Sequence, residues 1–452
     1  MVSTKRRRRR RAFALGACAF VVAAFALAAA AGLAAQTARI EPVRLGDLYT
    51  QVQRANPKAA AARSLAAAAQ ARVPGATRPP DPVLQFGFMN YMLPGLSPMS
   101  TIGMPQLQVM QMLPLGGKLT LAGRAASASA SAANLRTLDV LWDLRSETAM
   151  AFYDLYATDQ SLAVSRETLR LLADIERTAE AMYRVGQGHQ TDVLRAQVEI
   201  AKMTEDTLRM HAMRETMVAR LNALLDRDGE AALGAPLPPT FPDSVPSPGW
   251  LDSIAAANRP TIRAGLDEVR AADASERLAR KAIWPDLAVG MQYAQRGGEM
   301  GGGTERMGSL MLGASLPIFA RDRQLKMRDE AGAMKQMALA DVASMRAETR
   351  GEIGAAYANL RRARTLAQLY RTTVLPQAEA TVASALAAYQ VGNVDFMTLL
   401  DDRMTVNKYQ QELYALEADE GKAWANLEML TGRELFDPNN VAARVAATRG
   451  GK

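Results

Sequence analysis

The stretch Ala387-Ala388-Tyr389-Gln390-Val391-Gly392-Asn393-Val394-Asp395-Phe396-Met397-Thr398-Leu399-Leu400-Asp401 joins two long Ala-rich tracts at one glycine. Earlier in the chain, Ala181-Met182-Tyr183-Arg184-Val185-Gly186 leads to Leu194 with the same pattern, at a constant offset of 206 that matches Gly186 with Gly392. Helices commonly end on a residue in the left-handed conformation, which glycine adopts freely. Gly186 and Gly392 are therefore predicted to be the turns of two long helical hairpins, related by duplication.

The duplication extends well beyond the two turns. Pro57, Pro82 and Pro114 correspond to Pro260, Pro285 and Pro317 at one offset, 203. Three prolines at a constant offset indicate a repeat rather than chance. Because the offset grows to 206 at the glycines, the second half carries three extra residues between Pro317 and Gly392.

The periodicity of apolar residues predicts the elements of each half. Four segments alternate large apolar residues with small or polar ones, which is the strand signature, and long tracts with apolar spacings of three, four and seven residues predict coiled-coil helices. The predicted strands cover about residues 83–91, 106–113, 286–294 and 308–316, and the long helices cover 119–185, 189–226, 323–391 and 394–431. The domains are a signal peptide (1–35), a first repeat (36–233), a proline-rich linker (234–250), a second repeat (251–433) and a loose tail (434–452).

The net charge of +8 comes almost entirely from the N-terminus. Lys5 and the run Arg6–Arg11 supply seven positive charges, and residues 1–35 contain no acid, so the remainder carries +1. That balance gives no reason to expect nucleic acid as a partner. A basic run followed by an apolar stretch is the pattern of a secretory signal, although the stretch is also long enough for an uncleaved anchor. Leu15-Gly16-Ala17-Cys18 resembles a lipobox, which leaves lipidation of Cys18 as an alternative.

The four strands suggest how an exported protein of this kind meets a membrane. Each strand has about the nine to eleven residues that a tilted transmembrane strand needs, whereas the long helices carry recurrent charges. Four strands cannot close a barrel, and open edges are not tolerated in hydrocarbon. Three copies would supply twelve strands, so the expected fold is mainly α with transmembrane β: a composite β-barrel continued by a long helical tube.

Several short motifs in this order resemble the TolC-like outer-membrane efflux protein family, also called outer-membrane factors. The motifs are Asn56-Pro57, Leu113-Pro114-Leu115-Gly116-Gly117, Leu316-Pro317-Ile318, Leu375-Pro376-Gln377-Ala378 and Ala388-Tyr389-Gln390-Val391-Gly392. The resemblance implies a homotrimer with a 12-stranded β-barrel in outer-membrane lipid and an α-helical coiled-coil barrel in the periplasm. It further implies a periplasmic membrane-fusion adaptor and an inner-membrane pump of the RND or ABC type as partners.

The resemblance also implies a gate at the periplasmic tip. Asp401, nine residues past Gly392, matches a ring acid of the family, and neighbouring Asp402 is a second candidate. The position that bears the other acid in the best-known pattern is Thr398 here. The pair that would link the inner and outer helices is Asp192 and Tyr389. The alternative for the acids is a solvated helix face.

The sequence gives little support for metal binding or catalysis. Met89, Met92, Met99, Met104, Met110 and Met112 crowd the first strand pair. Thioethers suit Cu(I), but methionine also replaces leucine in apolar positions, and the second interpretation is preferred. His189 and His211 stand 22 residues apart without a nearby cysteine, so a metal site is not expected. The sequence contains no phosphate loop or nucleophile motif, which argues against an enzyme, and no cofactor is expected.

The resulting prediction is a passive exit duct that exports small molecules or metal ions. Two alternatives stay open at this point. One is the exit duct of a polypeptide (type I) secretion system, since cargo is not visible in the sequence. The other is a periplasmic coiled-coil adaptor, which would also have long hairpins but would lack the amphipathic strand pairs.

Overall fold

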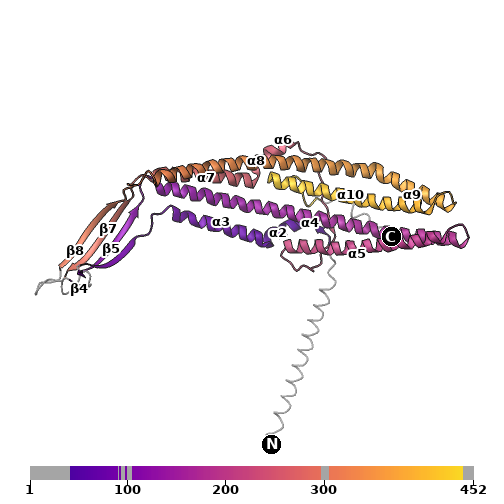
Figure 1. Ribbon diagram of the computed structural model, residues 1–452, viewed down its shortest axis with the longest axis horizontal. Coiled ribbons are helices and arrows are strands. Elements are labelled where there is room, and N and C mark those ends of the chain that lie inside the picture. The colour runs from indigo at the N-terminus through magenta and orange to yellow at the C-terminus, as the bar shows by residue number, and fades with distance from the viewer. Residues whose placement is uncertain (1–40, 90, 93–96, 99–103, 297–304, 441–452) are drawn as a thin grey trace, which may run out of the picture.

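The computed structural model describes residues 41–89, 91–92, 97–98, 104–296 and 305–440. The chain forms a long, narrow body with a β-sheet at one end and paired helices along the rest (Figure 1). The predicted signal peptide and Cys18 lie outside the described residues. In the part of the chain that is described, no helix combines the length and apolarity needed to cross a membrane.

The helices account for most of this length. Their bounds are α2 Leu45–Ala55, α3 Pro57–Ala76, α4 Lys118–Arg184, α5 Gln190–Leu224, α6 Pro248–Asn258, α7 Pro260–Lys281, α8 Gln324–Leu369, α9 Leu375–Gln390 and α10 Phe396–Thr431. A short π-helix, η1 (Tyr370–Val374), lies between α8 and α9. In the half nearest the sheet, neighbours pack in the order α3, α4, α7, α8; toward the other end α4 pairs with α5, and α9 pairs with α10.

The sheet is antiparallel in the order β2 (Val83–Met89), β5 (Met104–Leu113), β7 (Leu287–Arg296) and β8 (Glu305–Ala314). Its two faces differ sharply in polarity. Leu84, Val109, Met291 and Leu310 form one row across the four strands, and Gln85, Gln108, Gln292 and Ser309 form the next row on the opposite face. The apolar row is open to the outside, since Met291 and Leu310 are each 70% exposed. Among the described strands, β2 and β8 each have a neighbour on one side only.

Four shorter strands make two small pairs. Strand β1 (Val43–Arg44) pairs in parallel with β6 (Pro236–Leu237), and β3 (Tyr91–Met92) pairs with β4 (Ser97–Pro98). Strand β6 lies inside the segment 234–250 that the sequence predicts to be a linker, whereas β1 lies near the start of the first repeat. The first pair therefore ties the start of the described chain to the connection between the repeats.

The main core lies near the middle of the body, and segments that were expected to be irregular complete it. Phe241 stacks on Trp424, with ring centroids 6.2 Å apart, and Phe436 meets both rings edge-on. Phe436 is only 7% exposed, and the carbonyl of Asn440 accepts hydrogen bonds from Thr240. The expectation of a loose tail from residue 434 is thus wrong for residues 434–440, because an aromatic side chain anchors them in the core.

A buried charge cluster adjoins this core. Arg145 Nη1 lies 2.6 Å from a carboxylate oxygen of Glu434, and Nη2 lies 3.3 Å from one of Glu428. The guanidinium also stacks 4.2 Å from the ring centre of Tyr49. Glu428 is 1% exposed and accepts backbone N–H groups of Leu435 and Phe436. Burial raises the pKa of the Glu428 carboxyl to about 7, against the opposing charge of Arg145 and the two N–H donors.

The structure locates the three extra residues of the second repeat. The buried positions of α8 (Val342, Thr349, Ile353, Ala356, Leu360, Ala363 and Ala367) correspond to the inward face of α4 at an offset of 205. Two extra residues therefore precede α8, in the turn after Pro317. The third lies in η1, because the offset is 206 beyond it. A π-helix takes one more residue per hydrogen-bonded ring than an α-helix, so η1 accommodates the insertion without breaking the helix.

Candidate functional site

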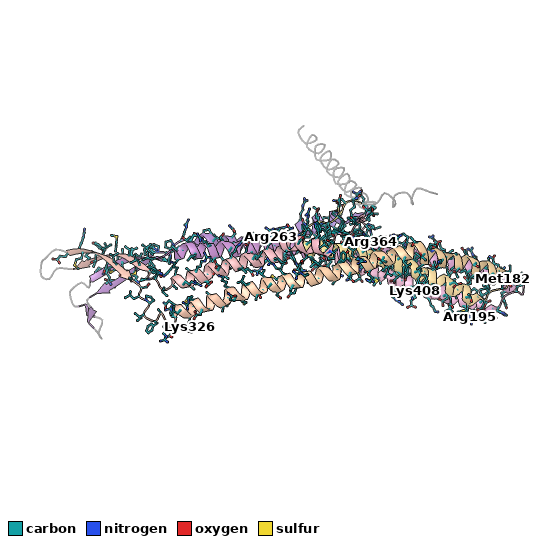
Figure 2. All side chains as sticks on the ribbon, turned by 90° about the horizontal axis from the view of Figure 1, so that it is seen from above. Met182, Arg195, Arg263, Lys326, Arg364 and Lys408 are labelled. Atoms are coloured by element: carbon teal, nitrogen blue, oxygen red, sulfur yellow. The ribbon has the colours of Figure 1, made fainter. Side chains whose placement is uncertain are left out.

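The two hairpin turns lie together at the end of the body away from the sheet (Figure 2, near Met182). Gly186 and Gly392 have φ angles of 75° and 76°. In each turn the glycine N–H donates to a tyrosine carbonyl, Tyr183 or Tyr389, at 3.0 Å. The following residue donates five positions back at 2.9 Å in both turns, which completes a Schellman motif. Both glycines thus require the left-handed backbone, and the two turns have the same geometry.

Asp192 and Tyr389 are both buried in the small core behind these turns. Asp192, in the first turn of α5, is 8% exposed, and Tyr389, near the end of α9, is 6% exposed. The ring of Tyr389 packs against Phe396 at 5.6 Å. Its hydroxyl has no hydrogen-bond partner among the described residues. Burial, followed by the negative charges of Asp192 and Asp395, raises the pKa of the Tyr389 hydroxyl. The structure therefore brings the predicted pair into one core without a bond between them.

Asp401 and Asp402 occupy different faces of α10. Asp401 is exposed, and within the described chain its carboxylate has neither an ion pair nor a hydrogen bond. Asp402 is half-buried and, with Thr398, lines a depression of about 470 Å³ against α9. Arg195, the counterpart of Asp401, lies near the same tip (labelled in Figure 2). It lines a separate depression of about 380 Å³ with Met397 and Leu400. The duplicated turns consequently carry opposite charges at equivalent positions.

Arg403 is a charged residue of this region that sequence reasoning missed. Its Nε is buried and has no hydrogen-bond partner in the described chain. Burial lowers the pKa of the guanidinium, while the charges of Glu167 and Glu379 act in the opposite direction. A basic residue on a charged helix carries no sequence signal that would distinguish it, so only the packing of α10 against its neighbours reveals it.

A layer of buried polar side chains links α4 to α10 further from the tip. The hydroxyl of Thr168 donates to Asn407 Oδ1 at 3.0 Å, and Gln411 Nε2 donates to Ser165 Oγ at 3.2 Å. A shift of one helix along the other would break these hydrogen bonds and leave buried polar groups without partners, which lowers stability. The layer therefore fixes how the two hairpins are aligned along their length.

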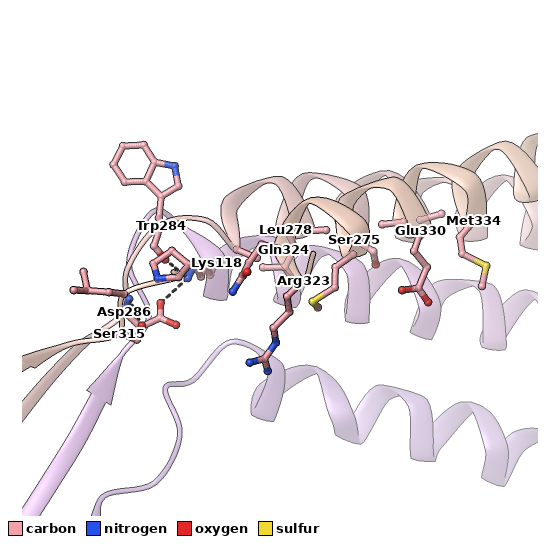
Figure 3. A pocket seen from close by; sticks show the side chains of 17 residues that line it. Lys118, Ser275, Leu278, Trp284, Asp286, Ser315, Arg323, Gln324, Glu330 and Met334 are labelled. Carbon is pink, nitrogen blue, oxygen red and sulfur yellow. Dashed lines mark hydrogen bonds and ion pairs between the residues drawn. The ribbon is translucent and has the colours of Figure 1, made fainter. Parts of the chain in front are cut away.

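At the other end of the helical body, where the helices meet the sheet, a contact between Lys118 and Asp286 joins the two repeats. Lys118 Nζ lies 2.7 Å from Asp286 Oδ1 and donates to the carbonyl of Trp284, also at 2.7 Å (Figure 3). Beside this contact, α7 and the start of α8 border a groove of about 790 Å³. No cluster of three or more His, Cys, Asp or Glu side chains that could hold a metal ion occurs among the described residues.

Comparison with known proteins accounts for this architecture. The family model described as "Outer membrane efflux protein" matches residues 48–227, which lie within the first predicted repeat, and residues 251–433, the range predicted for the second. The chain belongs to the outer membrane efflux protein family. A curated relative, the cobalt-zinc-cadmium resistance protein CzcC of Cupriavidus metallidurans, is 23% identical over 328 residues, which cover 71% of this chain and 75% of CzcC.

Solved structures of outer-membrane proteins and channels share the fold of this family member. CusC superposes with a TM-score of 0.75 at 16% identity, covering 87% of this chain and 93% of CusC. The outer membrane protein VceC of Vibrio cholerae gives 0.74 at 18% identity, covering 87% and 97%. The outer membrane channel MtrE of Neisseria gonorrhoeae gives 0.70 at 17% identity, covering 87% and 89%. The predicted fold class, a mainly helical body with a smaller strand part, is confirmed, and membership of a channel family confirms that the chain is not an enzyme.

Proposed function

We propose that this protein is the outer-membrane exit duct of a tripartite efflux system. The main support is that the two ends of the molecule differ: one is an amphipathic antiparallel sheet, and the other consists of paired helical hairpins (Figure 1). An apolar outer face with a polar inner face is what a lipid-embedded barrel strand requires. The helical body would then extend into the periplasm, toward an adaptor and an inner-membrane pump of the RND or ABC type.

Three copies are needed to make this duct. Among the described strands, β2 and β8 have a neighbouring strand on one side only, and open sheet edges are excluded from hydrocarbon. A homotrimer would join the sheets into a barrel of twelve strands, which lies in the range of outer-membrane barrels. Residues 1–35 would direct export, and Cys18 would be either removed with them or lipidated.

The cargo is proposed to be metal ions or small molecules. The support is the relative CzcC, whose name assigns it to cobalt, zinc and cadmium resistance. Its 23% identity makes the metal a proposal for this chain. In this function the chain supplies a passage, and the pump supplies the energy and selects the cargo.

The tip is proposed to be the gate of the duct. Exposed Asp401 would form a ring of like charges in a trimer, where like charges raise a carboxyl pKa and attract cations. Asp402 is the second candidate. Asp192 and Tyr389 would latch the hairpins when the gate closes, since both are buried at the tip and the tyrosine hydroxyl has no hydrogen-bond partner among the described residues.

Membrane fractionation combined with gel mobility tests the proposed function. The full chain is expected in the outer-membrane fraction, and it should migrate as a trimer before heating and as a monomer afterwards. Deletion of the gene should lower resistance to cobalt, zinc or cadmium, and the intact chain should restore it. A soluble monomer in the periplasm would contradict the proposal.

A further inference from the structure

The groove between α7 and the start of α8 has the size and lining of a small-molecule site (Figure 3). Its volume of about 790 Å³ lies within the range of roughly 300–1,000 Å³ that is typical of pockets for such molecules. Apolar lining comes from Leu278 and Ala279 on α7 and from Met327 and Met334 on α8. Charged and polar side chains stand among them, so the lining suits a molecule that is itself amphipathic.

The groove opens on the polar face of the sheet. Asp286 and Ser315 extend the pairing of β7 with β8 by one residue, since the N–H of Ser315 donates to the carbonyl of Asp286 at 3.0 Å. Asp286 lies six residues before Gln292, and Ser315 lies six residues after Ser309. Side chains an even number of positions apart on a strand share a face, so Asp286 and Ser315 continue the polar face. Both line the groove.

Four charged side chains line the groove, and two of them are unpaired. Lys118 and Asp286 form an ion pair at 2.7 Å. Arg323 and Glu330 are both exposed, and within the described chain neither side chain has an ion pair or a hydrogen bond. They are seven residues apart, roughly 10 Å along a helix, and Figure 3 shows both side chains projecting to the same side of α8. A free cation and a free anion therefore border one groove.

The amide of Gln324 is a further and independent sign of a ligand. Its Oε1 is buried and has no hydrogen-bond partner among the described residues. The same side chain lines the groove. A buried polar atom without a partner costs free energy, and a bound molecule with a hydrogen-bonding group would remove that cost.

We propose that this groove binds amphipathic zwitterions: small organic molecules in which an apolar body separates an ammonium from a carboxylate. The inference rests on the proposed function, in which the polar face of the sheet lines the duct, and it names a class among the small molecules of that function. The ammonium pairs with Glu330, the carboxylate pairs with Arg323, and a polar group of the body bonds to Gln324. Methionine side chains adapt to apolar bodies of different shape and make favourable contacts with aromatic rings.

A zwitterion fits this groove better than an ion of one sign. A cation paired with Glu330 would lie near the positive charge of Arg323, and an anion paired with Arg323 would lie near Glu330. Such like-charge contacts oppose binding. The four charged lining residues sum to zero, which matches a ligand that carries both charges. Metal ions fit less well, because the described residues contain no cluster of three or more His, Cys, Asp or Glu side chains.

Three forms of one dipeptide test the proposal. Leucyl-phenylalanine carries both charges, its C-terminal amide carries only the ammonium, and its N-acetyl form carries only the carboxylate. Two residues span up to about 7 Å, so the termini can meet both side chains. Binding to the purified full chain in a non-ionic detergent is measured by equilibrium dialysis. The zwitterion should bind about ten-fold more tightly than either blocked form, which corresponds to one charge-assisted hydrogen bond.

Charge-removing variants assign the two ends of the ligand. Glu330→Gln should weaken the binding of leucyl-phenylalanine about ten-fold without weakening that of the N-acetyl form. Arg323→Gln should also weaken the zwitterion but should not weaken the amide form. Asp341→Asn and Arg346→Gln are the matched controls, because they remove exposed charges of α8 that do not line the groove. Both should leave all three affinities unchanged.

Gel mobility before and after heating separates this inference from the proposed function. A heat-sensitive trimer that binds the three forms equally, or binds none, would overturn the inference and leave the proposed function intact. The same holds for a preference that survives in both groove variants. A soluble monomer that binds the zwitterion selectively would overturn the proposed function but not the specificity of the groove. A monomer without selective binding would overturn both.

Discussion

The ring of Tyr153 occupies the space that a side chain at position 421 would need. A Cβ built on Gly421 would lie 2.3 Å from two ring carbons of Tyr153, which is itself fully buried. Gly421→Ala is therefore expected to force α10 away from α4 and to lower the free energy of unfolding by about 1–3 kcal/mol. Chemical denaturation of the purified protein measures the change.

Gly354→Ala is the matched control for that variant. Gly354 also lies inside a long helix, but nothing is within 4 Å of a Cβ at this position. Alanine should stabilise the helix there by about 0.5–1 kcal/mol. Equal effects at positions 354 and 421 would show that the contact with Tyr153 is unimportant.

Gly392→Ala should destabilise the tip through the backbone alone. Its φ is 76°, and no atom lies within 4 Å of a Cβ at this position. The left-handed conformation costs a non-glycine residue roughly 1–2 kcal/mol, and less for asparagine. Gly392→Asn should thus lose less stability than Gly392→Ala. Hydrogen exchange of the α9–α10 turn would detect the difference, and identical exchange in the two variants would contradict the explanation.

Asp401→Asn should weaken the interaction of the duct with cations. If the exposed carboxylates form a ring in the trimer, removing three negative charges lowers the local cation concentration. Single-channel recordings in planar bilayers should show reduced cation preference and reduced block by divalent cations. Asp402→Asn is the comparison, because its side chain lies in a depression against α9. An unchanged ion preference in Asp401→Asn would reject the gate assignment.

The protonation of Glu428 should make stability depend on pH. Burial raises its pKa from 4.5 to about 7 in the folded chain, so between these values the folded state binds more protons than the unfolded state. Stability contributed by this group is complete below about pH 4.5 and is lost as the pH rises through 7. Unfolding free energies measured from pH 4.5 to 8 should fall by on the order of 1–3 kcal/mol from this group.

Glu428→Gln should remove most of that dependence, because an amide does not titrate and still accepts the two backbone N–H groups. Arg145→Met tests the other partner of this buried ion pair. It leaves a buried carboxylate without its cation, which costs about 3–5 kcal/mol where the group stays charged. A pH profile for Glu428→Gln that matches the parent would assign the dependence to another group.

The large features of the fold could be predicted because each has a local cause. Gly186 and Gly392 mark the hairpin turns, because glycine adopts the left-handed backbone freely. Pro57 and Pro260 mark the starts of two helices, and the alternation of apolar with small or polar residues marks the strands. The interruption at η1 was not predicted, since Pro376 only signals a disturbance and does not specify its form. The ordering of Phe436 was also missed, because its partners, Phe241 and Trp424, are remote in sequence.

The candidate site was predictable in its residues but not in its contacts. The family resemblance pairs Asp192 with Tyr389, and the structure buries both at the tip, where the tyrosine hydroxyl has no partner among the described residues. Which face of α10 Asp401 occupies depends on how the helix packs. The partnerless Nε of Arg403 depends on the same packing, and a single sequence does not contain that information.

The π-helix η1 determines which way the side chains of α9 point around the helix axis. Each residue added to an α-helix turns everything beyond it by about 100°. Without the wide turn at Tyr370–Val374, the extra residue of the second repeat would swing Ala385 and Tyr389 a quarter-turn or more out of the tip core. With it, the helix beyond keeps its original phase. The two hairpins can therefore differ by one residue in length and still end level, with their turns side by side.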